Sequence, residues 1–240
     1  MRRPRRVTVA LPTEVAAQGG LAYSVWLPPP QRTNGAGVLI LHGAGSCKES
    51  HHDYARVVLG AGFAALAFDQ RGHGESDSPM DGRVLEDIGR MAALLRARIG
   101  SRAAPLALRG SSMGGYLAIL AGPLIDAGAV VAICPASPEG LRRGLRSETL
   151  SFAADVPALE TFLSAHDLTR AVAALSAPLL LLHAEGDEQV PVQHSRELAR
   201  NFISPGSRLI TVPGGHHRSI QHDTELQAVS LRFIEQALGV

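Results

Sequence analysis

The chain has 240 residues, of which 45% are hydrophobic and 19% are charged, and its formal net charge at pH 7 is +1. This is the composition of a soluble globular protein, and it excludes a bias toward nucleic acid, a membrane surface or acidic partners. A length of 240 residues suits one domain, 1–240, with a sizeable hydrophobic core.

The N-terminal segment and the two cysteines favour a cytoplasmic protein. An Arg5-Arg6 pair resembles part of a twin-arginine export signal, but the apolar run that follows stops at Pro12. A secretory signal needs about 7 to 15 apolar residues and a membrane span about 18, and we find neither. Cys47 and Cys134 have no CxxC spacing and are expected to be reduced thiols.

The predicted elements begin with a hairpin and continue as a parallel sheet. Residues 6–11 and 21–27 alternate apolar and polar side chains around Gly19-Gly20, which predicts two antiparallel strands. The next short runs are almost uniformly apolar, as expected for strands covered on both faces. These runs are 37–42, 62–69, 105–110, 129–134, 178–187 and 208–215.

Helical periodicity lies between the later strands. Apolar residues recur every three or four positions in 84–99, 113–120, 192–202 and 226–238. Alternation of strand and helix predicts an α/β fold with an eight-stranded, mostly parallel sheet flanked by helices. The connection 135–177, after the sixth strand, is too long for a simple crossover, so we expect it to form a small cap of one to three helices.

Ser112 is the candidate nucleophile. In the stretch "RGSSMGG", Ser112 has glycine at both second positions, Gly110 and Gly114, whereas Ser111 does not. The motif follows a predicted strand and opens a predicted helix, which is the setting of the sharp turn that exposes a nucleophilic hydroxyl. A helix N-cap in a glycine-rich turn is the structural alternative.

A serine hydroxyl needs a base, and the base needs an acid that orients it. Asp187 follows one predicted strand, and two adjacent histidines, His216 and His217, follow the next. Glu185 and Glu188 are rival acids in the same loop. We predict Asp187 as the acid and His216 as the base, with His217 as a neighbouring or substrate-contacting residue.

The chain resembles members of the α/β-hydrolase superfamily, specifically its esterase, monoacylglycerol-lipase-like and serine-aminopeptidase-like branches. The resemblance is carried by the order Ser112, Asp187, His216 along the chain and by the segments "LILHGAG" and "VPGGHH". The resemblance covers nearly the whole chain. It implies an oxyanion hole formed by the N–H groups of Ala44 and Met113. It also implies that His42 orders the loop that carries Ala44 and that it does not transfer protons.

Other polar clusters receive a structural interpretation. His51, His52 and Asp53 are poor candidates for a metal site because consecutive ligands rarely converge on one ion. His73 is expected to be a satisfied polar contact. The three arginines of the predicted cap are expected to form a solvated basic face, although they could also meet an acidic substrate group; they are Arg142, Arg143 and Arg146.

These residues predict a serine hydrolase that cleaves a carboxylic ester of small to medium size through an acyl-enzyme, with water as the second substrate and without cofactor or metal. Thioester, amide, peptide or C–C bond hydrolysis and perhydrolysis on the same scaffold remain open, because the pocket and the cap set the leaving group. A non-catalytic ligand-binding sensor is a further alternative. The sequence does not determine the oligomeric state.

Overall fold

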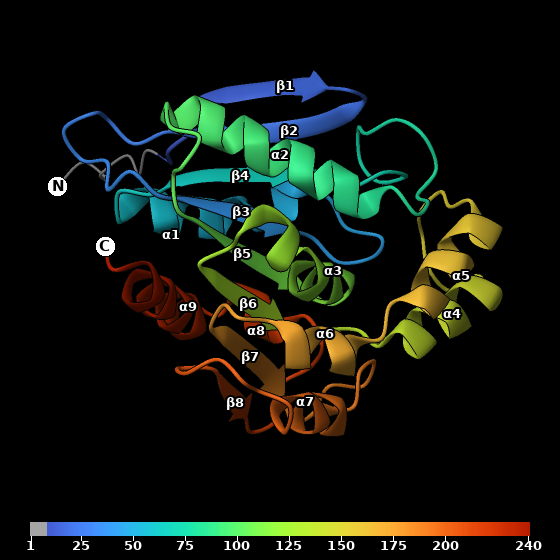
Figure 1. The fold of residues 1–240 in the computed structure, drawn as a ribbon. Coiled ribbons are helices and arrows are strands. Elements are labelled where there is room, and N and C mark those ends of the chain that lie inside the picture. The colour runs from blue at the N-terminus through green and yellow to red at the C-terminus, as the bar shows by residue number, and fades with distance from the viewer. Residues whose placement is uncertain (1–8) are drawn as a thin grey trace, which may run out of the picture.

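The chain is described by a computed structural model that covers residues 9–240 (Figure 1). These residues form one eight-stranded sheet with the order β1-β2-β4-β3-β5-β6-β7-β8. β1 and β2 pair antiparallel, β2 also pairs antiparallel with β4, and all other neighbours are parallel. The strands are β1 (Glu14–Gln18), β2 (Leu21–Trp26), β3 (Gly37–Leu41), β4 (Ala64–Phe68), β5 (Leu106–Ser111), β6 (Ala129–Ile133), β7 (Leu179–Ala184) and β8 (Arg208–Val212).

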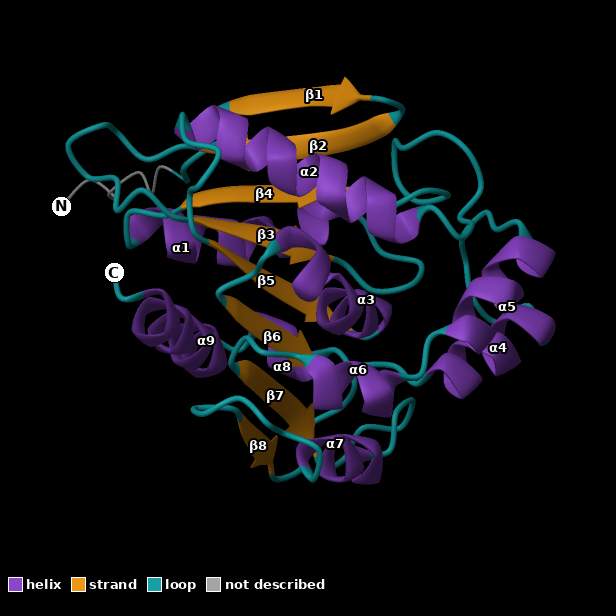
Figure 2. Cartoon of the chain, viewed as in Figure 1, coloured by secondary structure: helices purple, strands orange, loops and turns teal. Residues whose placement is uncertain are grey.

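Helices cover both faces of the sheet (Figure 2). α2, α3, α6 and α7 contribute to one face, and α1, α8 and α9 contribute to the other. The helices are α1 (His52–Gly60), α2 (Val84–Ile99), α3 (Met113–Ala121), α4 (Pro138–Arg146), α5 (Val156–Ala165), α6 (Leu168–Ala174), α7 (Val192–Ala199), α8 (Ser219–His222) and α9 (Thr224–Leu238), with short 3-10 turns η1 (Lys48–His51) and η2 (Pro123–Ile125). The predicted fold class is confirmed.

The uniform apolar character of the central strands follows from this arrangement. Along β3, Val38 and Ile40 pack in the core beneath α1 and α9, whereas Leu39 and Leu41 pack in the core beneath α2 and α3. Successive side chains of a strand point to opposite faces, so a strand covered on both faces must be apolar at every position.

The first predicted strand was placed too early in the chain. Residues 6–8 of the predicted strand 6–11 lie outside the described residues, and residues 9–11 are not in a strand. The hairpin turns at Gly19 and Gly20, whose φ values are 59° and 80°. This tight turn pairs Gln18 with Leu21 and therefore selects the residues directly before it, beginning at Glu14, as β1.

The long connection between β6 and β7 contains α4, α5 and α6. In Figure 1, α4 and α5 project beyond the sheet, whereas α6 lies against the body of the fold near α3. A short parallel bridge between Met80 and Ala154 joins this connection to the loop after β4. Its backbone hydrogen bonds run from the N–H of Met80 to the carbonyl of Ala153 (2.8 Å) and from the N–H of Asp155 to the carbonyl of Met80 (2.9 Å).

The predicted helices after β4, β5, β7 and β8 are all present, but α1 was not predicted. Its buried face consists only of Tyr54, Ala55 and Val58, which gives a weak periodic signal. Among the helices of residues 9–240, none combines the length and the apolar character that crossing a membrane requires.

Candidate active site

Ser112 lies in a sharp turn between β5 and α3. Its backbone has φ 52° and ψ −119°, which a residue with a side chain rarely adopts. Three backbone hydrogen bonds hold the turn: the N–H of Ser112 donates to the carbonyl of Ile133 (2.8 Å), and the carbonyl of Ser112 accepts from the N–H groups of Tyr116 and Ala136 (3.0 Å each). The surrounding structure therefore maintains a strained conformation at the predicted nucleophile, as is common at functional sites.

The glycines around Ser112 are required because backbone segments pass very close to them. A Cβ atom at Gly110 would lie 2.0 Å from the carbonyl oxygen of Gly114, and one at Gly114 would lie 2.3 Å from the carbonyl oxygen of Leu41. Neither backbone group can move without displacing a strand or a helix. The sequence motif thus reflects close packing of the turn against β3 and α3.

Asp187 follows β7, and its side chain is fully buried. Its Oδ1 accepts hydrogen bonds from the N–H groups of Gln189 (2.9 Å) and Val190 (2.8 Å). Its Oδ2 lies 2.7 Å from Nδ1 of His217. Burial raises the pKa of this carboxyl, but the hydrogen bonds from His183 and His217 outweigh burial and hold the pKa well below its ordinary value.

The histidine whose ring contacts Asp187 is His217 and not His216, contrary to the predicted pairing of Asp187 with His216. The side chain of His217 is 7% exposed, and its backbone N–H donates to Oε2 of Glu188 at 3.2 Å. His216 is exposed, and its N–H and carbonyl both bind the hydroxyl of Ser219, at 3.0 and 2.7 Å. These two hydrogen bonds tie the backbone of His216 to Ser219, and the ring of His217 faces Asp187.

No local pattern in the sequence distinguishes the two histidines. Ile220, in α8, is 2% exposed and packs in the core beneath the sheet. His217 and His216 stand three and four positions before Ile220, and both spacings fall on one face of a helix, so helical periodicity favours neither histidine. The prediction relied on counting from the Gly-Gly pair, which does not account for the turn that leads into α8.

His183, in β7, supports Asp187 and was not identified from the sequence. Its ring is fully buried, with Nδ1 2.7 Å from the hydroxyl of Ser195 and Nε2 2.9 Å from the carbonyl of Val190. A carbonyl only accepts, so Nε2 carries the proton and Nδ1 accepts from Ser195. The same Nε2 lies 3.4 Å from Oδ2 of Asp187, which places a second N–H dipole beside the carboxylate.

Cys134, His183 and Asp187 place potential metal ligands within 4.8 Å of one another. Both ring nitrogens of His183 already have hydrogen-bond partners, and burial raises the pKa of the Cys134 thiol, which disfavours the thiolate that binds metals. The donor set therefore fits a polar support for Asp187 better than a metal centre.

The two predicted oxyanion donors lie on either side of Ser112. Met113 is the first residue of α3, and Ala44 follows Gly43, at which a Cβ atom would lie only 3.2 Å from Cβ of Ser112. The backbone of the loop thus passes directly against the serine. Among the turns and loops of residues 9–240, no backbone carbonyl accepts the N–H of Ala44 or of Met113.

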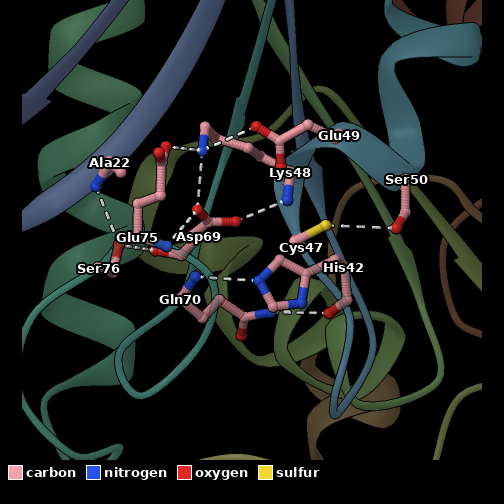
Figure 3. Close-up of polar contacts among 10 residues, drawn as sticks. All are labelled: Ala22, His42, Cys47, Lys48, Glu49, Ser50, Asp69, Gln70, Glu75 and Ser76. Atoms are coloured by element: carbon pink, nitrogen blue, oxygen red, sulfur yellow. Dashed lines mark hydrogen bonds and ion pairs between the residues drawn. The ribbon is translucent and has the colours of Figure 1, made fainter.

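His42 orders this loop, as the resemblance implied (Figure 3). Its Nδ1 lies 2.8 Å from the carbonyl of Gly43, and its Nε2 accepts the N–H of Gln70 at 3.0 Å. The side-chain amide of Gln70 donates to the carbonyl of His42 at 2.7 Å. Burial lowers the pKa of His42 to about 4, so the ring remains neutral near neutral pH and serves as a structural contact.

A buried ion pair fixes the far end of the same loop (Figure 3). The ammonium of Lys48 lies 2.9 Å from Oδ2 of Asp69, and both side chains are almost completely buried. Asp69 also accepts the backbone N–H groups of Lys48 (2.6 Å) and Glu75 (2.9 Å). Residues 42–48, here called the oxyanion loop, are therefore held at both ends by groups from the segment after β4.

Ser112 and His217 line the same cavity, which has a volume of about 390 Å³. Gly43 and Ala44 of the oxyanion loop form another part of its wall. Ser112, His217 with Asp187 beside it, and the oxyanion loop thus come from the ends of four different strands and meet at one place. Such convergence at the carboxyl ends of parallel strands is where ligands bind in open α/β sheets.

Two family models match the chain. Residues 32–158, more than half of the chain, match the model described as serine aminopeptidase, S33, and residues 161–237 match the model described as TAP-like protein. A monoacylglycerol lipase from Mycolicibacterium smegmatis is 28% identical over 84% of this chain and 88% of its own length.

Solved structures share the fold. A soluble variant of the monoglyceride lipase from Saccharomyces cerevisiae, in complex with a substrate analog, has a TM-score of 0.76 at 15% identity and 99% coverage of both chains. A thermophilic esterase from Thermogutta terrifontis has a TM-score of 0.70 at 18% identity, with 93% of this chain and 97% of that chain covered.

Proposed function

Since the chain belongs to the α/β-hydrolase superfamily and, within it, matches the serine aminopeptidase S33 family, it is a hydrolase, and we propose that it cleaves carboxylic esters of small to medium size through an acyl-enzyme. The observation that carries the proposal is the convergence of Ser112, His217 and the oxyanion loop on one cavity. The lipase and esterase names of the relatives favour an ester over other acyl compounds.

The proposed mechanism assigns one role to each side chain. The N–H of His217 at Nδ1 donates to Asp187, which leaves Nε2 free to take the proton of Ser112. Ser112 attacks the acyl carbonyl, and the buried carboxylate of Asp187 stabilises the imidazolium that forms. Nε2–H then protonates the leaving alcohol, and a water activated by His217 releases the acid.

The N–H groups of Ala44 and Met113 stabilise the oxyanion in both steps. Removing one such donor in a serine hydrolase costs about 100- to 1,000-fold in rate, so their orientation before the reaction matters. The hydrogen bonds of His42 with Gln70 and the ion pair of Lys48 with Asp69 hold Ala44 in place.

The family description also raises peptide-bond cleavage as a second candidate. An aminopeptidase must bind the ammonium group of its substrate, and an anionic side chain serves this purpose best. The described residues that line the cavity with His217 include no Asp or Glu, but the neighbouring cavity that also contains Ser112 is lined by Glu197 and Arg143. The charges of the two cavity walls therefore do not separate the two substrates, and the names of the relatives favour the ester.

The proposal is tested with 4-nitrophenyl esters from acetate to laurate, an amino acid 4-nitroanilide, and a fluorophosphonate label. We expect ester turnover and labelling by the wild type, and a loss of about 1,000-fold or more in Ser112→Ala. Ser164→Ala is the control, because this serine lies on the exposed side of α5 and lines neither cavity that contains Ser112. Turnover of the anilide alone would support the peptidase, and full activity of Ser112→Ala would refute the assignment.

A further inference from the structure

Arg109 is a charged residue within the apolar central sheet. It lies in β5, three residues before Ser112, and is 1% exposed. Side chains alternate between the two faces of a strand, so Arg109 points to the same face as Ala107, which packs in the core with α1 and α9. Burial of a guanidinium group costs free energy unless its N–H groups find acceptors, so the contacts of Arg109 must offset a large desolvation penalty.

Arg109 contacts an aromatic ring and a backbone carbonyl. Its Cζ lies 3.8 Å from the centre of the ring of Tyr54 in α1, which is a cation–π contact. Its Nη2 donates to the carbonyl of Gln221 at 2.9 Å, and a hydrogen bond from a charged donor is stronger than one between neutral groups. Gln221 belongs to α8, so Arg109 joins the strand that leads to Ser112 to the helix that follows His217.

Two further side chains bind the end of α8. The side-chain amide of Gln227 in α9, which is 3% exposed, donates to the same carbonyl of Gln221 at 3.1 Å and to Oδ2 of Asp53 at 2.7 Å. Asp53 in α1 also binds Nδ1 of His222 at 2.9 Å. Arg109, Gln227 and Asp53, here called the α8 support, thus hold the last two residues of α8 from three different elements.

The position of α8 depends on such contacts. It has only four residues, Ser219–His222, and so short a helix is not stable by itself. His217 lies two residues before the first residue of α8, and the backbone and hydroxyl of Ser219 bind the backbone of His216. The position of α8 therefore determines where His217 lies.

The contact of His217 with Asp187 tolerates little movement. Nδ1 of His217 lies 2.7 Å from Oδ2 of Asp187, and a displacement of about 1 Å takes this pair beyond hydrogen-bond distance. A misplacement of about 1 Å at a catalytic group can cost about 100-fold in rate. The α8 support therefore acts on the reaction from a distance, since its three side chains line neither cavity that contains Ser112.

We propose that the three residues of the α8 support are positioning residues, which fix α8 and thereby hold the ring of His217 against Asp187. This inference rests on the proposed ester hydrolase function, in which His217 is the base. Through Arg109, the strand that carries Ser112 to the site also sets the place of the base.

Arg109→Met tests the proposal, because methionine fills much of the space of arginine but donates no hydrogen bond. We expect kcat for 4-nitrophenyl butyrate to fall about tenfold to 100-fold at a temperature at which the variant is folded. Arg96→Met is the matched control: Arg96 in α2 likewise donates to backbone carbonyls, those of Ala104 (3.1 Å) and Ile125 (2.9 Å), and neither residue lines a cavity that contains Ser112. An equal loss of kcat in Arg96→Met overturns the proposal.

A spectroscopic measurement separates positioning from stability alone. A short hydrogen bond to a carboxylate moves the proton resonance of the donor N–H downfield, and the downfield signal that His217→Gln removes belongs to the bond with Asp187. We expect this resonance to be lost or broadened in Arg109→Met and unchanged in Arg96→Met. A folded Arg109→Met variant that keeps both the resonance and the kcat of the wild type overturns the proposal.

Gln227→Met carries the same test if Arg109→Met does not fold, because it removes a donor to Gln221 and leaves Arg109 in place. We expect kcat to fall about fivefold, which corresponds to one net hydrogen bond, and the resonance of His217 to broaden. An unchanged kcat together with an unchanged resonance in Gln227→Met counts against the proposal in the same way.

The outcomes distinguish this proposal from the proposed function. Ester turnover by the wild type that neither Arg109→Met nor Gln227→Met reduces overturns the positioning role but supports the ester hydrolase. Failure of the wild type with every ester and with the fluorophosphonate label overturns the ester hydrolase. In that case the resonance of the two variants still decides whether the α8 support sets the contact of His217 with Asp187.

Discussion

Two loops bring functional groups to Ser112, and they are stabilised in different ways. The oxyanion loop (residues 42–48) is held by the neutral ring of His42 at one end and by the buried Lys48–Asp69 pair at the other. The segment after β8, residues 213–218, here called the histidine loop, is largely exposed and depends on contacts of His217 with Asp187 and Glu188.

The difference corresponds to what each loop does in the proposed mechanism. Backbone donors stabilise an oxyanion only if they are oriented in advance, which favours a loop fixed by buried charge and hydrogen bonds. A base must change its protonation state and exchange protons with substrate and water, which a partly open loop permits. Mutations in the oxyanion loop should therefore reduce stability, whereas mutations at the base should reduce activity.

The largest expected effect distinguishes the two neighbouring histidines of the histidine loop. His217→Ala should lower kcat/KM for 4-nitrophenyl butyrate about 1,000-fold or more, because it removes the proposed base. His216→Ala should change it less than about threefold, since that side chain is exposed. His216→Ala should retain the thermal unfolding midpoint of the wild type, whereas His217→Ala should lower it by several degrees, because the buried carboxylate of Asp187 loses one hydrogen-bond donor. The reverse pattern of activities would restore His216 as the base.

The next effect concerns the ion pair of the oxyanion loop. Lys48→Met should destabilise the fold by about 3 to 5 kcal/mol, because it leaves the buried carboxylate of Asp69 without its partner. Urea unfolding of the variant and the wild type measures the difference. Arg83→Met is the control, because the arginine of the pair with Asp81 is exposed and its loss should change the free energy of unfolding little. Equal losses of unfolding free energy in Lys48→Met and Arg83→Met would contradict the expectation that the buried ion pair contributes more than the exposed one.

A smaller effect should depend on pH. Burial lowers the pKa of His42 to about 4 from an unfolded value near 6.5. Between these values the unfolded chain binds a proton at this position and the folded chain does not, so stability falls as the pH decreases from about 6.5 toward 4. At pH 5 this should amount to about 2 kcal/mol.

His42→Gln tests this dependence, because an amide occupies the site without titrating. We expect the loss of unfolding free energy between pH 7 and pH 5 to be about 2 kcal/mol smaller in the variant than in the wild type. The measurement is urea unfolding at the two pH values. Identical losses would show that His42 is not responsible for acid destabilisation.

The smallest expected effect is that of adding a side chain at Gly214 in the histidine loop. Gly214 has φ 66°, and a Cβ atom there would meet nothing within 4 Å. Gly214→Ala should therefore cost only about 1 kcal/mol of unfolding free energy, the strain of a left-handed alanine. Gly89→Ala in α2, which has ordinary helical backbone and free space, should stabilise by up to about 1 kcal/mol. A loss of unfolding free energy well above 1 kcal/mol in Gly214→Ala would contradict the view that the histidine loop is less tightly held than the oxyanion loop.

The central sheet and most of its helices could be predicted because the signal is local and repeated. Residues 84–99 predicted α2 at the observed bounds, since its buried side chains recur at helical spacing and Gly100 ends it in the left-handed region. The hairpin could be predicted but not its first strand, because residues 6–11 alternate polar and apolar side chains whereas the observed strand, residues 14–18, carries three apolar residues in a row, and only pairing with β2 selects it.

The candidate site was also only partly predictable. Ser112 and Asp187 stand out because their chemistry and their neighbouring glycines are unusual in the sequence. His183 does not, because it lies inside an apolar strand, and its contact with Asp187 depends on how β7 and the start of α7 fold around the carboxylate.

The sequence alone thus determined the α/β fold, the strained turn at Ser112 and the set of strand ends at which chemistry can occur, because hydrophobic periodicity and glycine placement are properties of neighbouring residues. Only the tertiary structure decided which of two adjacent histidines meets Asp187 and which buried charges hold the oxyanion loop. These features depend on contacts between residues far apart in the chain, and such contacts leave no local pattern.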